Sequence, residues 1–355
     1  MDSLFETVQL GRLSLRNRVV MAPMTRSRAA EPDMPTDLMV EYYRQRAGAG
    51  LIISEGISPS ADGIGYCRTA GIYNDAQVEA WTRVLDAVHA EGGIMVAQLM
   101  HCGRVASHYN KTPGSETVAP SAIPARGEIY TDQAGMVALD EPRELGTDEV
   151  PLVVQQYADA TANAYAAGFD GVELHCTSGY LPAQFLSTGS NHRVDHYGGS
   201  VQNRVRFPLE VLRAMSAVDG GDRVGFRICP DNPFNDLSDT DPRDTFAAFL
   251  AGASELGLAY VHAIRLPKGR VDNLGLAQQH FSGRVIGNES FTADEAASFI
   301  DAGALAAVSF GRQFIANPDL VDRLWRGKPL AEFDLASLYT PGAKGYTDYP
   351  AYGAA

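Results

Sequence analysis

The chain has few cysteines, and no two of them are close in the sequence. Its 355 residues include four cysteines, at Cys67, Cys102, Cys176 and Cys229, with no C-x-x-C pair. This spacing argues against a zinc site and against a disulfide framework, so no metal is expected. Scarce, scattered cysteines also fit a reducing compartment, and the expected location is the cytoplasm.

The chain is also short of positive charge. Its 29 lysines and arginines face 43 aspartates and glutamates, which gives a net charge of −14. Such a surface repels nucleic-acid phosphates and anionic lipids, so neither a nucleic acid nor a membrane is an expected partner. No run of 18 apolar residues is present, so no membrane span is predicted. The start, Met1–Glu6, has neither a basic stretch nor an apolar one, so no signal peptide is expected.

Hydrophobic residues make up 45% of the chain, which is enough for a large core. Eight short runs are continuously apolar, as strands are when both faces are buried. They are Arg18–Ala22, Leu51–Ser54, Ile94–Gln98, Gly171–His175, Val224–Ile228, Tyr260–Ile264, Val285–Gly287 and Ala307–Phe310.

Segments with helical periodicity separate these runs. They are Ala76–Ala90, Asp148–Gly168, Val201–Val218 and Thr245–Leu256, and Thr292 with Glu295 forms a capping box that opens another helix. Eight strands alternating with helices predict an α/β fold, a (β/α)₈ TIM barrel formed as a single domain over residues 1–355. A doubly wound sheet is the alternative, although it would normally need fewer strands.

One stretch, Met100–Thr147, interrupts the alternation. It follows the third strand, is rich in Gly, Pro, Ser and Thr, and shows no helical pattern. Connections this long are uncommon unless they are functional. We expect a capping excursion that partly covers the C-terminal mouth of the barrel, where barrel enzymes place their active sites. A plain surface excursion is the alternative.

Polar residues gather at the ends of the predicted strands. Taken singly, Gln98 and Arg227 could satisfy each other, and His175 could be an ordinary core histidine. Taken together, the Gly287-Asn288 turn and Gly311-Arg312, after the seventh and eighth strands, predict a phosphate site. An amide and an arginine in the same mouth suit a flat heterocycle that becomes anionic on reduction. No Walker loop is present, and Gly63-Ile64-Gly65 is a weak dinucleotide motif because it lacks a third glycine.

Long stretches in the same order along the whole chain resemble the Old Yellow Enzyme family of FMN-dependent ene-reductases, in its bacterial, classical-type branch. The stretches are 17–26 (NRVVMAPMTR), 41–47 (EYYRQRA), 97–104 (AQLMHCGR), 168–175 (GFDGVELH), 191–193 (NHR), 197–204 (YGGSVQNR), 310–312 (FGR), 316–320 (ANPDL) and 345–350 (GYTDYP). The resemblance implies a TIM barrel with non-covalently bound FMN.

The resemblance also implies roles for individual residues around the flavin. Those expected to bind the cofactor are Pro23, Met24, Thr25, Gly56, Gln98, Arg227, Asn288, Glu289, Gly311 and Arg312. Among these, the Thr25 hydroxyl would bond the flavin O4 and tune its potential, and Arg227 would stabilise the reduced ring. A glutamate is unusual beside a phosphate, so only the Glu289 backbone is expected to take part.

The implied reaction has two halves. NADPH or NADH reduces the flavin, and an activated alkene, either an α,β-unsaturated carbonyl compound or a nitroalkene, then accepts a hydride at its β-carbon. His175 would bond the substrate oxygen and Tyr180 would protonate the α-carbon, while Tyr66 and Tyr346 shape the substrate cavity. The expected partners are small molecules, and the expected state is a monomer or a small homo-oligomer.

Two positions depart from the family pattern. Ser178 stands where a histidine or asparagine usually gives a second donor to the substrate oxygen, and Met100 replaces a tryptophan. These changes leave open neutral drift or a specialised secondary-metabolism reductase, isomerase or dehydrogenase with an atypical substrate. A flavin-binding protein without reductase turnover, such as an isomerase or a sensor, is a further alternative. Without the resemblance, a sugar-phosphate aldolase or isomerase would be another, although Lys268 is the only lysine close to a strand end.

Overall fold

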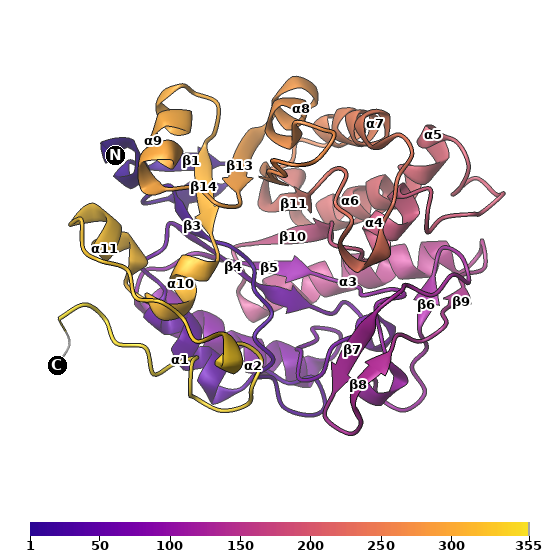
Figure 1. The fold of residues 1–355 in the computed structure, drawn as a ribbon, viewed down its shortest axis with the longest axis horizontal. Coiled ribbons are helices and arrows are strands. Elements are labelled where there is room, and N and C mark those ends of the chain that lie inside the picture. The colour runs from indigo at the N-terminus through magenta and orange to yellow at the C-terminus, as the bar shows by residue number, and fades with distance from the viewer. Residues whose placement is uncertain (354–355) are drawn as a thin grey trace.

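The computed structural model describes residues 1–353 and shows one closed barrel of strands surrounded by helices (Figure 1). The barrel strands are β3 (Val19–Met21), β4 (Leu51–Ile57), β5 (Met95–Leu99), β10 (Gly171–Cys176), β11 (Val224–Ile228), β12 (Tyr260–Ile264), β13 (Arg284–Asn288) and β14 (Ala307–Phe310). The other strands are β1 (Val8–Leu10), β2 (Leu13–Leu15), β6 (Val118–Ala119), β7 (Glu128–Thr131), β8 (Gly135–Ala138) and β9 (Arg143–Glu144). The helices are α1 (Asp37–Gln45), α2 (Asp75–Ala90), α3 (Val150–Ala167), α4 (Leu181–Leu186), α5 (Val201–Arg204), α6 (Arg206–Asp219), α7 (Pro242–Ser254), α8 (Asn273–His280), α9 (Ala293–Asp301), α10 (Arg312–Ala316) and α11 (Leu320–Trp325).

The eight barrel strands follow one another around the closed sheet in chain order. Every neighbouring pair is parallel, and β14 pairs with β3 to close the ring. All eight correspond to the predicted apolar runs, so the predicted TIM barrel is confirmed. Parallel strands place all their carboxyl ends at one mouth, which therefore collects the polar residues that follow the strands.

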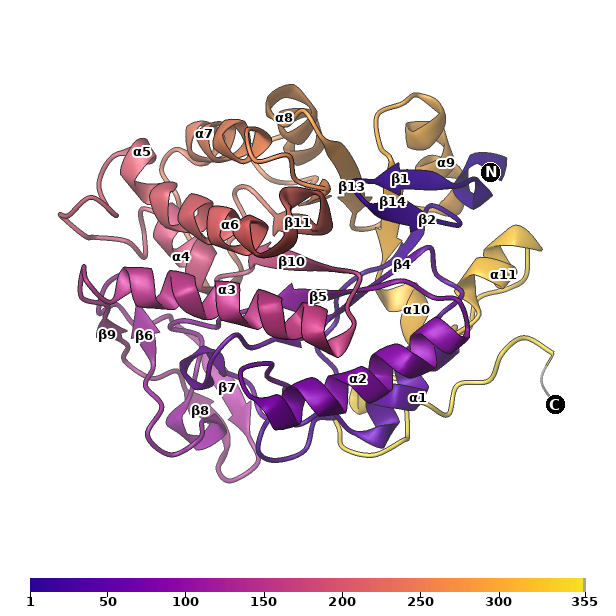
Figure 2. The same cartoon turned by 180° about the vertical axis from the view of Figure 1, so that it is seen from behind.

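Alternate residues of the strands pack into two separate apolar clusters. Those pointing outward, such as Leu174 and Phe226, join the helices in the larger cluster. Those pointing inward near the amino ends, such as Val20 and Ile53, pack with Leu10 and Leu15 of the β1–β2 hairpin. Figure 2 shows this hairpin on the side of the barrel that faces away from the viewer in Figure 1. The hairpin therefore closes the bottom of the barrel and leaves the carboxyl mouth for the site.

The helix predicted over Val201–Val218 is divided in the structure. Helix α5 ends at Arg204 and α6 begins at Arg206. Pro208 explains the division, because its missing N–H cannot bond the Arg204 carbonyl and its ring crowds that carbonyl. The Thr292 cap is present, with the Glu295 backbone N–H donating to the Thr292 hydroxyl at 3.2 Å. The Glu295 side chain does not complete the capping box, because its carboxylate binds Arg265.

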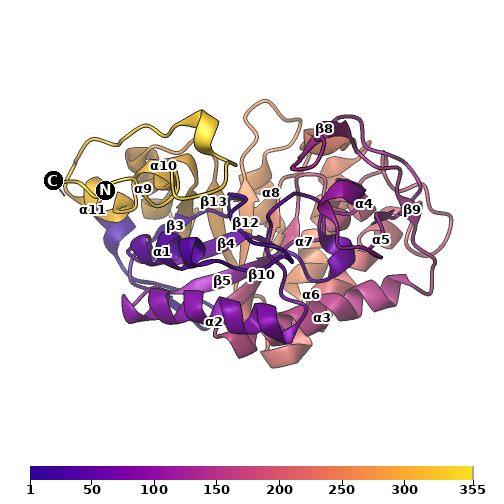
Figure 3. The same ribbon diagram turned by 90° about the horizontal axis from the view of Figure 1, so that it is seen from below.

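The excursion after β5 forms two small strand pairs, β6 with β9 and β7 with β8, and no α-helix of its own within the described chain. Figure 3 shows the β7–β8 hairpin and the yellow C-terminal segment rising on the same side of the molecule. Residues Cys102, Val105 and Leu139 of the excursion pack against Tyr180 and Tyr66. The excursion thus supports one wall of the mouth from outside.

Over residues 1–353, no helix is long and apolar enough to cross a membrane. Nor does this part of the chain gather three or more metal-binding side chains in one place.

Candidate active site

A cavity of about 940 Å³ opens at the carboxyl ends of the barrel strands. This volume is near the upper end of the range for small-molecule and cofactor sites. Its lining residues are Ala22, Pro23, Met24, Thr25, Arg26, Gln98, Met100, His175, Ser178, Tyr180, Arg227, Phe234, Asn288, Glu289, Ser290, Phe291, Thr292, Ser309, Phe310, Gly311, Arg312, Gln313, Ile315, Phe333, Leu335, Leu338 and Tyr339. Of the ten residues expected to bind the cofactor, all except Gly56 line this one cavity.

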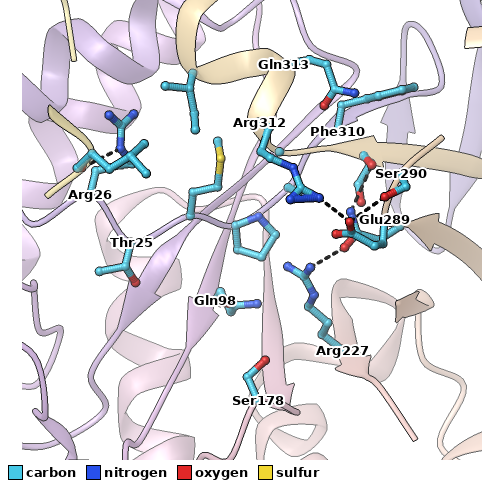
Figure 4. A pocket seen from close by; sticks show the side chains of 18 of the residues that line it. Thr25, Arg26, Gln98, Ser178, Arg227, Glu289, Ser290, Phe310, Arg312 and Gln313 are labelled. Atoms are coloured by element: carbon cyan, nitrogen blue, oxygen red, sulfur yellow. Dashed lines mark hydrogen bonds and ion pairs between the residues drawn. The ribbon is translucent and has the colours of Figure 1, made fainter. Parts of the chain in front are cut away.

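Gln98 and Arg227 enter the cavity from β5 and β11, and they have separate partners. The Gln98 side-chain amide donates to Glu173 at 2.7 Å, and its backbone N–H donates to the Ser54 hydroxyl at 2.9 Å. Arg227 donates to the Asn288 side-chain oxygen at 2.6 Å, while its Nε is buried without a partner among the described residues. The two side chains therefore do not satisfy each other, and both are positioned toward a shared space (Figure 4).

The far end of the cavity is formed by the segments that follow β13 and β14. Glu289 and Ser290 have positive φ angles of 82° and 56°. Arg265 holds this turn from outside, donating from Nε to the Glu289 carbonyl and from a terminal nitrogen to the Ser290 carbonyl, each at 2.6 Å. Arg312, at the start of α10, pairs with the Glu289 carboxylate (Figure 4). The sequence predicts a role for the Glu289 backbone alone. In the structure its side chain also binds Arg312, the arginine expected to hold the phosphate.

His175 and Tyr180 form the opposite wall, with their rings edge to face at a centroid distance of 4.8 Å. Burial, reinforced by the nearby Arg227 charge, holds the pKa of His175 well below its ordinary value, so the imidazole is neutral at neutral pH. Its Nδ1 is buried and has no partner among the described residues. Burial also raises the pKa of Tyr180 well above its usual value. The Tyr180 hydroxyl is therefore protonated, and it donates to the Tyr66 hydroxyl at 3.2 Å.

Ser178 lies between these two residues with a φ of 59°. Its carbonyl accepts a hydrogen bond of 2.7 Å from the Asn235 side chain, which holds the turn. The Ser178 side chain lines the cavity (Figure 4). Asparagine and histidine are among the residues that adopt this left-handed conformation most readily, so the backbone itself would accept either one in place of serine.

Three predicted residues do not line the cavity. Gly56 lies beneath Met100, whose sulfur would be 2.5 Å from a Cβ placed at position 56. Tyr66 does not line the cavity itself, but it bonds and packs against Tyr180, which does. Tyr346 is fully buried and stacks on Tyr42 at 4.0 Å, with Arg28 over its ring at 4.8 Å. The expectation that Tyr346 shapes the substrate cavity does not hold, because this aromatic and arginine packing turns the ring into the core.

The cavity wall also contains residues that the sequence did not reveal. Phe333, Leu335, Leu338 and Tyr339 come from the C-terminal segment, which has no strand or helix periodicity to mark it. Beyond Met100, no residue of the Met100–Thr147 excursion lines the cavity within the described chain. The C-terminal segment therefore forms part of the cavity wall. The excursion, predicted as a partial lid, instead packs beside the cavity, against Tyr180.

The fold and this constellation correspond to a known class of flavoenzymes. Residues 3–331 match the model of the "NADH:flavin oxidoreductase / NADH oxidase family". The chain belongs to this family, which includes the Old Yellow Enzyme homologues, and it is an FMN-dependent oxidoreductase.

Individual relatives cover almost the full length. A "Probable flavin mononucleotide-dependent alkene reductase" of Leishmania infantum is 39% identical, and the match covers 98% of this chain and 97% of the relative. A "Chanoclavine-I aldehyde reductase" of Penicillium roqueforti is 40% identical over 98% of this chain and 96% of the relative. Among solved structures, morphinone reductase in complex with tetrahydroNAD is 43% identical, with a TM-score of 0.93 over 98% of this chain and 97% of the other. The Old Yellow Enzyme homologue from Zymomonas mobilis is 38% identical, with a TM-score of 0.94 over 98% and 99%.

Proposed function

We propose that the protein is an ene-reductase, which uses NADPH or NADH to reduce an activated alkene through FMN. The observation that carries the proposal is that one cavity is lined by Gln98 and Arg227, by Arg312 at one end, and by His175 and Tyr180. The residues fit FMN, because the buried Arg227 Nε has no partner within residues 1–353. A flat ring with several acceptor atoms would use such a donor.

When bound, FMN would supply the chemistry of hydride transfer between the nicotinamide and the alkene. Pro23, Met24 and Thr25 after β3 would support the ring, with the Thr25 hydroxyl donating to O4. Gln98 would bond the pyrimidine edge, and Arg227 would offset the negative charge that reduction brings. The Asn288–Ser290 turn, Gly311 and Arg312 would hold the phosphate, as the turns after the seventh and eighth strands do in many barrels.

His175 and Tyr180 would act on the alkene itself. A neutral His175 donates one N–H to the carbonyl or nitro oxygen, which stabilises the negative charge that develops there. Tyr180, protonated because of its raised pKa, gives its proton to the α-carbon. Tyr66 bonds the Tyr180 hydroxyl and holds it in place.

The purified protein is expected to be yellow and to release FMN on denaturation. Under anaerobic conditions it should oxidise NADPH or NADH when cyclohexenone or a nitroalkene is present, and form the saturated product. Chromatography of the released flavin and of the product checks both parts. Release of FAD, or failure of the colourless protein to take up added FMN, would contradict the cofactor assignment.

A specialised substrate is the second candidate, and the rim of the cavity favours it. Phe234, Leu335 and Tyr339 line the cavity although they are 58%, 74% and 60% exposed. An apolar rim of this kind suits a substrate larger than a simple cyclic enone, which would cover these side chains on binding. Two relatives are named as reductases of other substrates, chanoclavine-I aldehyde and 12-oxophytodienoate.

The Ser178→His variant tests whether position 178 limits simple substrates. An imidazole would restore a second donor to the substrate oxygen, and a hydrogen bond to an anion contributes about 1.5–3 kcal/mol. We expect the variant to bind p-substituted phenolates roughly tenfold more tightly or better, and to reduce cyclohexenone faster. Spectral titration of both proteins measures the binding, and flavin reduction by NAD(P)H is the control. Equal phenolate affinity in the two proteins would show that serine is competent as it stands.

A further inference from the structure

A buried polar chain lies under the floor of the cavity, inside the barrel. It begins at Gln98, whose amide donates to Glu173 at 2.7 Å. The other Glu173 oxygen is 3.1 Å from His262 Nδ1. On the far side of the ring, His262 Nε2 is 2.7 Å from the Ser309 hydroxyl. Glu173 and His262 are completely buried, and neither lines the cavity. The proposed reaction gives these two residues no role.

The charge state of Glu173 decides how the Gln98 amide is turned. Burial opposes ionisation of this carboxyl, but His262, Arg227 and Gln98 outweigh burial and hold its pKa below the ordinary value. An ionised carboxylate only accepts hydrogen bonds, so the Gln98 NH₂ group must face Glu173. The Gln98 carbonyl oxygen is then directed to the other side, where Gln98 lines the cavity.

The same carboxylate affects the electrostatics of the floor. Burial lowers the pKa of Arg227 below its ordinary value, and the negative charge of Glu173 partly offsets this effect. Glu173 thus stabilises the Arg227 cation, and it also places a negative charge below the ring site. Reduction of a flavin there adds negative charge to the cavity, and a nearby carboxylate opposes that change.

We propose that Glu173 is a positioning residue, which fixes the Gln98 carbonyl as an acceptor for the flavin N–H and holds the flavin reduction potential down. The proposal rests on the proposed function, because it requires FMN in this cavity. Glu173 does not line the cavity, so it acts through its neighbours. Two separate effects are expected, one on the hydrogen bond of Gln98 and one on the charge near the flavin.

The test is a double-mutant cycle on flavin-free protein reconstituted with FMN. Glu173→Gln can donate as well as accept, so it no longer fixes the Gln98 amide. We expect the FMN dissociation constant, measured by quenching of flavin fluorescence, to rise about tenfold. In a Gln98→Leu background, where no amide remains to be turned, the same change should leave the constant within about twofold.

The reduction potential tests the charge claim. Glu173→Gln should move the two-electron potential to more positive values by about 30 mV or more, which is a tenfold change in the equilibrium. The shift should persist in the Gln98→Leu background, because it depends on charge alone. Glu55 is a buried carboxyl on β4 that contacts Tyr43 and not Gln98. Burial raises its pKa to about 7, so the potentials are measured at about pH 8.5, where both carboxyls are ionised. Glu55→Gln is then the matched control. It should change neither quantity.

The outcomes separate the possible roles of Glu173. Equal loss of FMN affinity in both backgrounds, with a lower melting temperature of the flavin-free protein, would make Glu173 merely structural and overturn the positioning claim. An unchanged potential would overturn the charge claim. Failure of the wild-type protein to bind FMN would instead contradict the proposed function.

Discussion

Replacement of Tyr180 by phenylalanine is expected to slow alkene reduction by about 10²–10⁴-fold, the usual contribution of a general acid, while flavin reduction by the nicotinamide stays near normal. The change removes one hydroxyl and keeps the ring that packs against His175 at 4.8 Å. The hydroxyl is needed only when the α-carbon takes a proton. Stopped-flow traces of the two half-reactions measure the two steps separately.

Tyr66→Phe is the matched control for this experiment. It removes the partner of the Tyr180 hydroxyl but leaves the proton donor in place. A neutral hydrogen bond contributes about 0.5–1.5 kcal/mol. Its loss in Tyr66→Phe should therefore slow alkene reduction by about tenfold or less. Equal slowing of both half-reactions in Tyr180→Phe would show a structural role for Tyr180, and no slowing would show that another group supplies the proton.

The second large effect is expected at the proposed phosphate end. Arg312→Gln should weaken FMN binding by about 1.5–3 kcal/mol, the contribution of a hydrogen bond to a charged group, which corresponds to roughly 10–150-fold in affinity. The Arg312 side chain is 60% exposed and already pairs with Glu289. Its removal would therefore also leave the Glu289 carboxylate unpaired beside the phosphate.

Riboflavin, which lacks the phosphate, provides the control ligand. Its affinity should be almost the same in wild type and Arg312→Gln, because the ring contacts are unchanged. Glu289→Gln should instead tighten FMN binding, because it frees Arg312 and removes a negative charge. Fluorescence titration of the flavin-free proteins compares the two ligands. A parallel loss of FMN and riboflavin affinity would place Arg312 in the support of the fold and not at a phosphate.

The barrel could be predicted from the sequence because parallel strands buried on both faces give continuous apolar runs. Because all strands of a parallel barrel end at the same mouth, the polar residues that end these runs meet there; examples are Gln98, His175 and Arg227. Pro208 is visible in the sequence as a helix breaker, and the division between α5 and α6 shows that the backbone chemistry of proline outweighs helical periodicity at this point.

Other features depend on contacts that no local pattern records. Tyr346 belongs to a stretch that resembles the family, but its direction is set by stacking on Tyr42 and by arginines from a distant segment. The contribution of Leu335 and Tyr339 to the cavity depends on where an irregular C-terminal segment lies in space. The bond between Gln98 and Glu173 joins residues 75 positions apart in the chain. The parallel pairing of β5 with β10 places Gln98 beside Glu173.

Single-turnover reoxidation of the reduced holoenzyme tests the central claim most directly. The flavin is reduced with one equivalent of NAD(P)H carrying deuterium at the transferable position, under strict exclusion of oxygen, and is then mixed with a cyclic enone or a nitroalkene. The account predicts rapid return of the oxidised flavin absorbance and a saturated product with deuterium at the β-carbon. A flavin that stays reduced with every activated alkene, although the protein binds FMN stoichiometrically, would contradict it.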